Sequence, residues 1–202
     1  MQTILRLPVK NKANSFTLVE LLVVVSIIGI LAGLAIPGIQ SGLDKAKQQV
    51  DVSNIRQCGL ILFADANDNE GLFSTNSGTS LQVFQDLISK GQLNNVKVLA
   101  GNGFRAATGT NSVVADNIAW AYVRGLSTSD EGTIPLLLSK GITSLQDVVP
   151  LVRVNTGWKQ KGIVVYRVGN SAEFLRSGAA GAPVGSVKLG LDGMNLNYTI
   201  AQ

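Results

Sequence analysis

The 202-residue sequence contains no histidine and only one cysteine, Cys58. Without histidine, the chain lacks the side chain that most often acts as a general base near neutral pH and as a zinc ligand, which argues against an enzyme. A single cysteine cannot form an intramolecular disulfide, so an exported form must hold its fold by core packing, with or without a bound metal. Cys58 lies among regularly spaced apolar residues, and we expect it to be a small core residue.

Charged residues are few and unevenly distributed. They make up 15% of the chain, and the formal net charge is +4. The first fifteen residues contain no acid and three basic residues, Arg6, Lys10 and Lys12. Removing these three from the 17 Lys and Arg leaves 14 basic against 13 acidic residues, so the remainder is nearly neutral. The positive charge therefore reflects the N-terminus and says little about an acidic or nucleic-acid partner.

A long apolar run follows this basic segment. Residues 16–36 contain a single charged side chain, Glu20, in 21 positions. As a helix they would extend roughly 31 Å, close to the thickness of the hydrocarbon core of a bilayer. Because the flanking basic residues lie on the N-terminal side, the positive-inside rule places residues 1–15 in the cytoplasm and everything after Pro37 across the membrane.

Two ordinary interpretations of this run leave Glu20 unexplained. The first is a secretory signal peptide, with the small residues between Ala32 and Ala35 as a cleavage site before a released soluble domain. The second is a plain transmembrane anchor. A carboxylate in such a segment costs up to about 3 kcal/mol near the bilayer centre and less near its edge, so a lone acid there usually has a function.

The sequence Ser15-Phe16-Thr17-Leu18-Val19-Glu20 before an apolar run resembles the prepilin processing site of type IV pilins and type II secretion pseudopilins. The resemblance implies that prepilin peptidase cuts between Ser15 and Phe16 and methylates the new amine. Phe16 then becomes the mature N-terminus, Glu20 its fifth residue and Pro37 its twenty-second. The family usually has glycine before the cut, whereas this chain has Ser15, which bears on how completely the leader is removed.

The same resemblance gives Glu20 a role in assembly. In a filament its carboxylate would lie beside the Phe16 amine of a neighbouring subunit and set the register of the two chains. The alternatives are a carboxylate that reaches interfacial water and one that pairs with its own N-terminus. Gly29 and Gly33 form a G-x-x-x-G pattern that lets helices approach closely, and Pro37 is expected to bend the helix or interrupt its hydrogen bonds.

Beyond Pro37 the apolar residues keep a helical period, which predicts an amphipathic continuation that docks on a globular head. The predicted apolar stripe contains Ile39, Leu43, Ala46, Val50, Ile55, Cys58 and Leu62, and the predicted polar faces contain Asp44, Lys45, Lys47, Asp51 and Arg56.

The oxygen-rich stretch that follows, residues 65–71, invites a calcium interpretation. Its weak candidate ligands are Asp65, Asn67, Asn69 and Glu70. Glu70 stands where the tight turn of an EF-hand needs glycine, and Asn76 stands where the loop needs glutamate, so the stretch fails that test. Asn, Asp and Gly are also ordinary turn formers, and we expect a loop that ends the helix, with no cofactor.

The remaining chain predicts a small α+β head. A second helix is expected over residues 81–90, with Ser80 as N-cap and Gly91 just beyond its end. Strands are expected over residues 96–100, 118–123, 148–154, 162–168 and 196–200, and a loop over residues 178–185. The pattern G-x-G-x-x-A at residues 101–106 is not followed by a helix, so it does not predict nucleotide binding.

The predicted organisation is a cleaved basic leader at 1–15, a long helix at 16–66 with its transmembrane half at 16–36, and a globular head at 67–202. The fold class is α+β, with the amphipathic half of the helix packed on an antiparallel sheet, as the pilin resemblance implies. The expected protein is a single-pass inner-membrane subunit with a cytoplasmic N-terminus and a periplasmic head, found at the cell surface if its filament is a surface pilus.

The resemblance implies assembly into a type II secretion pseudopilus or a type IV pilus-like filament. The expected partners are prepilin peptidase, an inner-membrane assembly platform, membrane lipid, and other pilin or pseudopilin subunits in a homopolymer and with minor subunits. Two alternatives remain: a secreted or membrane-anchored periplasmic binding protein, and a minor pilin for adhesion or DNA uptake. DNA binding would use a thin basic and aromatic patch of Lys159, Lys161 and Arg167 around Trp158 and Tyr166; otherwise these residues form a solvated strand face.

Overall fold

A computed structural model describes residues 17–74, 78–142, 145–151, 157–191 and 198–201. Ser15, Phe16 and the other predicted leader residues lie outside these ranges. The chain divides into two compact units, Met1–Asp44 and Lys45–Gln202. Helix α1, Leu18–Asp68, contributes its first part to one unit and its second part to the other.

Local sequence determines both ends of α1. At the start, the Thr17 hydroxyl accepts a hydrogen bond from the Glu20 amide at 3.2 Å, while the Glu20 carboxylate accepts one from the Thr17 amide at 2.9 Å. This reciprocal pair is a capping box. At the other end the Gly71 amide donates to the Ala66 carbonyl at 2.8 Å, and Gly71 has a φ of 81°, a conformation that favours glycine. The helix continues through Pro37, so the proline ring does not end it.

The part of α1 within the head buries one narrow stripe, which is shifted from the predicted one. Ile55, Cys58 and Leu62 are buried, as predicted. Val50 was predicted to join them but is 56% exposed, whereas Asp51, predicted on a polar face, is only 4% exposed. Ile39, Leu43 and Ala46, which were also predicted on the stripe, are exposed. The buried series therefore begins at Asp51 rather than Ile39, and it advances to Leu62 in steps of four, three and four.

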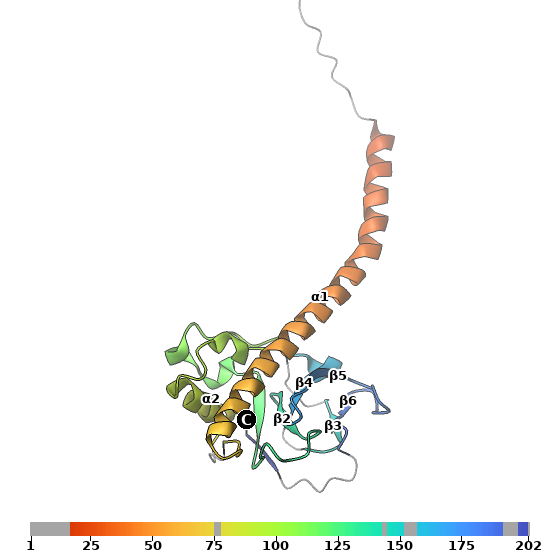
Figure 1. Ribbon diagram of the computed structural model, residues 1–202. Coiled ribbons are helices and arrows are strands. Elements are labelled where there is room, and N and C mark those ends of the chain that lie inside the picture. Colours follow the sequence, from red (N-terminus) through yellow and green to blue (C-terminus); the bar gives the residue numbers. More distant parts are fainter. Residues whose placement is uncertain (1–16, 75–77, 143–144, 152–156, 192–197, 202) are drawn as a thin grey trace, which may run out of the picture. The chain divides into compact units, whose positions relative to one another are not determined.

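A five-stranded antiparallel sheet forms the centre of the head (Figure 1). Its strand order is β5-β4-β2-β1-β7, and a separate antiparallel pair joins β3 to β6. The bounds of the first group are Trp120–Arg124 (β1), Pro135–Ser139 (β2), Gly162–Arg167 (β4), Ala172–Arg176 (β5) and Thr199–Ala201 (β7). The pair consists of Val148–Pro150 (β3) and Ser186–Lys188 (β6). An α+β fold with helix and sheet sharing one hydrophobic core is confirmed.

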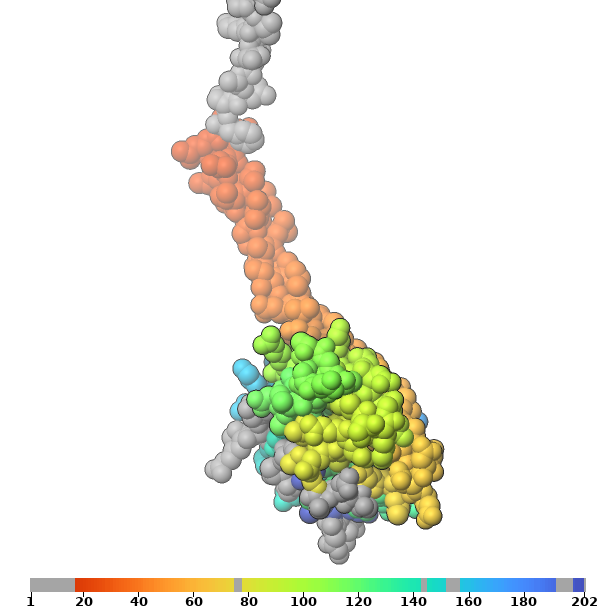
Figure 2. Space-filling view, turned by 90° about the vertical axis from the view of Figure 1, so that its left-hand side faces the viewer, coloured from red at the N-terminus to blue at the C-terminus, as the bar shows by residue number. Residues whose placement is uncertain are grey.

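Helix α2, Ser80–Ser89, was predicted almost correctly, although its N-cap is Thr79 rather than Ser80. The Ser80 hydroxyl instead donates to the Ala201 carbonyl and accepts from the Tyr122 amide, which ties the helix to β7 and β1. The segment containing α2 and the short 3₁₀ helices that follow it covers one side of the head beside the last turns of α1 (Figure 2).

The predicted strand over residues 96–100 is wrong, because Val96–Leu99 forms a 3₁₀ helix. Asn95 caps this turn by accepting a hydrogen bond from the Lys97 amide, and Val96, Val98 and Leu99 are all buried. A short buried apolar run has no period that separates a strand from a tight helical turn.

Gly59 shows how tightly α1 packs on the sheet. A Cβ atom added at Gly59 would lie 2.1 Å from a ring carbon of Tyr166, whose side chain is fully buried in β4. Glycine in a helix is normally about 1 kcal/mol worse than alanine, but here the missing methyl group makes room for the ring.

We therefore expect Gly59→Ala to destabilise the head by about 1–2 kcal/mol, because overpacking outweighs the gain in helix propensity. Thermal unfolding of the full chain in detergent, followed by circular dichroism, measures the change. Gly42→Ala is the matched control, since nothing lies within 4 Å of a Cβ at Gly42. Equal behaviour of the two variants would contradict close packing at Gly59.

Candidate assembly site

The first part of α1 exposes its apolar side chains in every direction. Leu18 is 79% exposed, and Leu22, Val24 and Ile28 are also exposed. Among the described residues, α1 is a helix that is long enough and apolar enough to cross a membrane. Its most apolar stretch of 18 residues is not buried anywhere within the chain. Exposed apolar surface costs about 25 cal/mol per Å² in water, so these side chains need lipid or other chains around them.

Glu20 lies in the first turn of this apolar helix. Besides the Thr17 amide, its carboxylate accepts a hydrogen bond from the Thr17 hydroxyl at 2.9 Å. The carboxylate is exposed, and its bound oxygen faces Thr17, the residue that precedes the helix. Glu20 therefore caps its own helix in the single chain. Its pairing with a neighbouring subunit remains a prediction.

Gly29, Gly33 and Pro37 follow one another at intervals of four residues, so they share one face of α1. An added Cβ would meet nothing within 4 Å at either glycine. This face is open along its length, which is what close approach of a second helix requires. The described chain has no helix packed there, and the assembly role of the three residues stays a prediction.

Asp51 was predicted to lie on a polar face of the helix, but its side chain is buried in the head. Its two carboxylate oxygens accept the Asn102 amide at 2.9 and 3.1 Å, and one of them accepts the Trp158 indole N–H at 2.7 Å. No ion pair to Asp51 occurs within the described ranges. Burial raises the pKa of this carboxyl above its usual value, and the two donors oppose that rise. Asp51 therefore joins α1 to two loops of the head.

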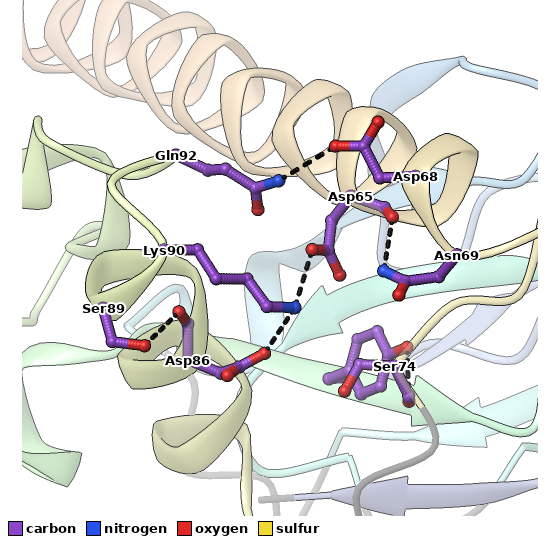
Figure 3. A network of polar contacts seen from close by, with 9 residues as sticks. Asp65, Asp68, Asn69, Ser74, Asp86, Ser89, Lys90 and Gln92 are labelled. Carbon is purple, nitrogen blue, oxygen red and sulfur yellow. Dashed lines mark hydrogen bonds and ion pairs between the residues drawn. The ribbon is translucent and has the colours of Figure 1, made fainter.

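One of the predicted calcium ligands near the end of α1, Asp65, is paired with a lysine (Figure 3). The Lys90 ammonium lies 2.8 Å from a carboxylate oxygen of Asp65 and 2.8 Å from one of Asp86. Asp65 is helical and buried rather than part of a loop, and the Asn69 side-chain amide donates to its carbonyl at 2.6 Å. The Asp65 and Asp86 carboxylates raise the pKa of Lys90, which stays protonated and supplies the positive charge.

Asn67 and Glu70, the other two candidates, are exposed. Glu70 has a φ of 56° in the turn between Asp68 and Gly71, as expected of a segment that ends a helix. Among the described residues no group of three or more His, Cys, Asp or Glu side chains could hold a metal ion.

The aromatic side chains proposed for DNA stacking are not available for it. Trp158 is 4% exposed and Tyr166 is fully buried, with its hydroxyl donating to Asn170 at 2.8 Å. Burial raises the pKa of Tyr166 to about 12. Cys58 is buried as predicted, with its sulfur 3.5 Å from the Val98 carbonyl oxygen, and burial raises the pKa of its thiol. These three groups belong to the core.

The fold and the first helix together define a class of protein. It has an α+β head and a long N-terminal helix, and the first part of that helix is an exposed apolar segment suited to a membrane or a bundle of helices. A family model described as "Prokaryotic N-terminal methylation motif" matches residues 10–36, which contain Ser15, Phe16, Glu20 and Gly29 to Ile36.

Curated relatives agree with this motif. The chain is 38% identical over 68 residues to type II secretion system core protein G of Escherichia coli (strain K12), an alignment that covers 34% of this chain and 47% of the relative. It is 46% identical over 46 residues to the protein of that name from Aeromonas hydrophila, covering 23% and 32%. It is 36% identical over 81 residues to the one from Klebsiella michiganensis, covering 40% and 54%.

The chain spans about half the length, or less, of the curated relatives it matches. No solved structure matches it significantly. The motif and the relatives support a place for the chain in the type IV pilin-like and pseudopilin family.

Proposed function

We propose that this protein is a structural subunit of a type II secretion pseudopilus or a related type IV pilus-like filament. One observation carries the proposal: a continuous helix begins within a matched methylation motif, and its first half is predominantly apolar and exposed, with a single charged side chain, the carboxylate in its first turn. A signal peptide needs no such carboxylate, and a plain anchor gains nothing from it. The role is non-catalytic, because assembly rests on packing and charge pairing.

In this proposal prepilin peptidase removes residues 1–15 and methylates the Phe16 amine. The subunit waits in the inner membrane with its N-terminus cytoplasmic and its head periplasmic, as the basic residues before Phe16 favour. An assembly platform then transfers it from lipid into a bundle of helices. The apolar side chains leave one apolar environment for another, so the transfer costs little hydrophobic energy, and packing at the small residues favours the bundle.

Glu20 gives that transfer its specificity. Inside a helix bundle water is scarce, and an unpaired carboxylate or amine there is strongly disfavoured. Pairing the Glu20 carboxylate of one subunit with the Phe16 amine of the next satisfies both charges at one axial offset only. Slipped arrangements leave both charges unpaired, so the pair selects the register.

Cell fractionation tests the proposal. The chain is expressed with a prepilin peptidase, with and without a type II secretion assembly apparatus. We expect it in the carbonate-washed membrane fraction without the apparatus, and in sheared filaments visible by immunogold electron microscopy with it. Recovery in the soluble periplasm under both conditions would reject a membrane-anchored subunit.

The proposed subunit uses no cofactor. Lys90 supplies to Asp65 and Asp86 the positive charge that a bound cation would otherwise bring. We expect EGTA to leave the unfolding temperature of the purified chain unchanged, and added CaCl₂ to do the same. A fall of several degrees in EGTA that calcium reverses would show a bound calcium ion.

A further inference from the structure

A groove on the head separates α1 from the edge of the sheet. Residues 48–56 of α1 form one wall, and β5 residues 172–176 form the other. Both walls belong to the unit Lys45–Gln202. Strand β5 is the last strand of its sheet, paired with β4 on one side only. The half-buried ring of Phe174, which contacts Trp158 edge to face at 5.2 Å, anchors this wall to the core.

Two arginines line this groove, one on each wall. Arg56 comes from α1 and Arg176 from β5, and both side chains are exposed. Within the described ranges neither forms a hydrogen bond or an ion pair through its side chain. The one acid in the groove, Glu173, is already paired with Arg167 at 3.0 Å. The groove therefore presents two unneutralised positive charges to whatever enters it.

The opposite charge gathers at the end of the same helix. Asp68 and Glu70 are exposed, and Asp65 and Asp86 already share the Lys90 ammonium (Figure 3). The Asp68 carboxylate has one weak contact, with the Gln92 side-chain amide at 3.4 Å. These four acidic residues and Lys90 line one pocket at the end of α1, and the turn Asp68–Glu70 presents the unneutralised excess to solvent.

The two charged regions of one chain cannot meet each other. Arg56 and Asp68 are twelve residues apart on a continuous helix, which holds them about 18 Å apart along its axis. A groove and an acidic turn that are complementary but rigidly separated can pair only between two molecules. Such a contact is heterologous, and repeating it adds copies in an open row rather than closing a dimer.

We propose that the groove between α1 and β5 is the docking surface for the acidic turn Asp68–Glu70 of a second copy of this chain. The inference rests on the proposed function, since it describes how the heads of a homopolymer bind one another. Arg56 and Arg176, on the two walls of the groove, form ion pairs with the carboxylates of Asp68 and Glu70. The contact adds to the pairing of the apolar helices and weakens as salt rises.

Charge exchange tests the proposal. The variant Arg56→Glu/Arg176→Glu brings like charges together, so we expect the sedimentable filament fraction to fall by about tenfold. Adding Asp68→Arg/Glu70→Arg to the same chain restores opposite charges and should restore assembly. The control Lys97→Glu/Arg105→Glu makes an equal change in net charge at exposed residues outside the groove and should assemble like the wild type. Thermal unfolding of each variant shows whether its head is folded.

The outcomes separate this inference from the proposed function. If the wild type itself forms no filaments, the proposed function fails. If the wild type assembles and the groove variant assembles equally well, the groove inference fails. If the groove variant is defective but the fourfold variant is not rescued, the occupant is something else, such as an anionic lipid surface, and the inference also fails. As a second measurement, Arg176→Cys/Glu70→Cys should give an oxidation-dependent ladder of cross-linked copies, since Cys58 is buried.

Discussion

Glu20→Ala and Glu20→Gln are both expected to reduce filament assembly by about a hundredfold while leaving the chain in the membrane. Removing one partner of a charge pair in a water-poor bundle leaves the Phe16 amine unpaired, which costs about 3–5 kcal/mol. Membrane retention should not change, because it depends on the apolar side chains from Leu18 onward. The measurement is the ratio of sheared filament to membrane-bound subunit for each variant.

The glutamine variant separates assembly from local capping. In the single chain Glu20 accepts hydrogen bonds from the amide and hydroxyl of Thr17, and a glutamine oxygen can accept both equally well. Thr17→Val removes the hydroxyl contact but keeps the carboxylate. If capping alone mattered, Glu20→Gln would assemble normally and Thr17→Val would be impaired. The charge-pairing account predicts the reverse order, and the capping pattern would contradict it.

Asp51→Ala is expected to destabilise the head by about 2–4 kcal/mol, or several degrees in unfolding temperature. The substitution leaves the indole N–H of Trp158 and the amide of Asn102 without an acceptor, although both lie against a buried part of α1. It also removes the link between α1 and the two loops. Thermal unfolding of the full chain in detergent measures the loss, and Trp158 fluorescence reports the local environment.

The raised pKa of Asp51 predicts the direction in which the stability of the head changes with pH. The folded-state pKa of Asp51 is raised above its ordinary value, chiefly by burial. Between those two values the native state holds more protons than the unfolded one, so stability due to Asp51 falls as pH rises through that window. Asp51→Asn lacks the titration and keeps one acceptor. We expect the difference in unfolding free energy between the wild type and Asp51→Asn to favour the wild type most at acid pH and to shrink as the pH rises. A difference that grew with rising pH would contradict this.

Local patterns in the sequence predicted the helix, whereas contacts made only in the folded head determined the rest. The apolar run, the helical period and the turn residues after Asp65 are local signals, and α1 extends from Leu18 to Asp68 accordingly. The predicted stripe contained one irregular step of five, from Val50 to Ile55. Asp51 falls within that step, and counting it in place of Val50 restores the regular helical spacing. Burial of its carboxylate is stabilised by hydrogen bonds from Trp158 and Asn102, which the local sequence pattern does not reveal.

Local sequence patterns likewise predicted only some of the strands. β1 and β4 were predicted from β-branched and aromatic residues, and both form. β2, Pro135–Ser139, was missed because a fully buried central strand lacks alternation and this one begins with proline. β5 and β6, which were not predicted as strands, lie at edges of their sheets. Trp158 and Tyr166 looked like surface aromatics near basic residues, and only the packing of α1 and β4 shows them buried.

The mature N-terminus provides the most direct measurement of the central claim, which is that the apolar segment remains on the exported subunit. Intact mass and N-terminal sequencing of the protein from membranes or filaments would supply it. We predict a chain that begins with N-methylated Phe16 and retains Glu20 and everything after it. A chain that begins after Ala35 would have lost the membrane segment and the carboxylate together, and would contradict the account.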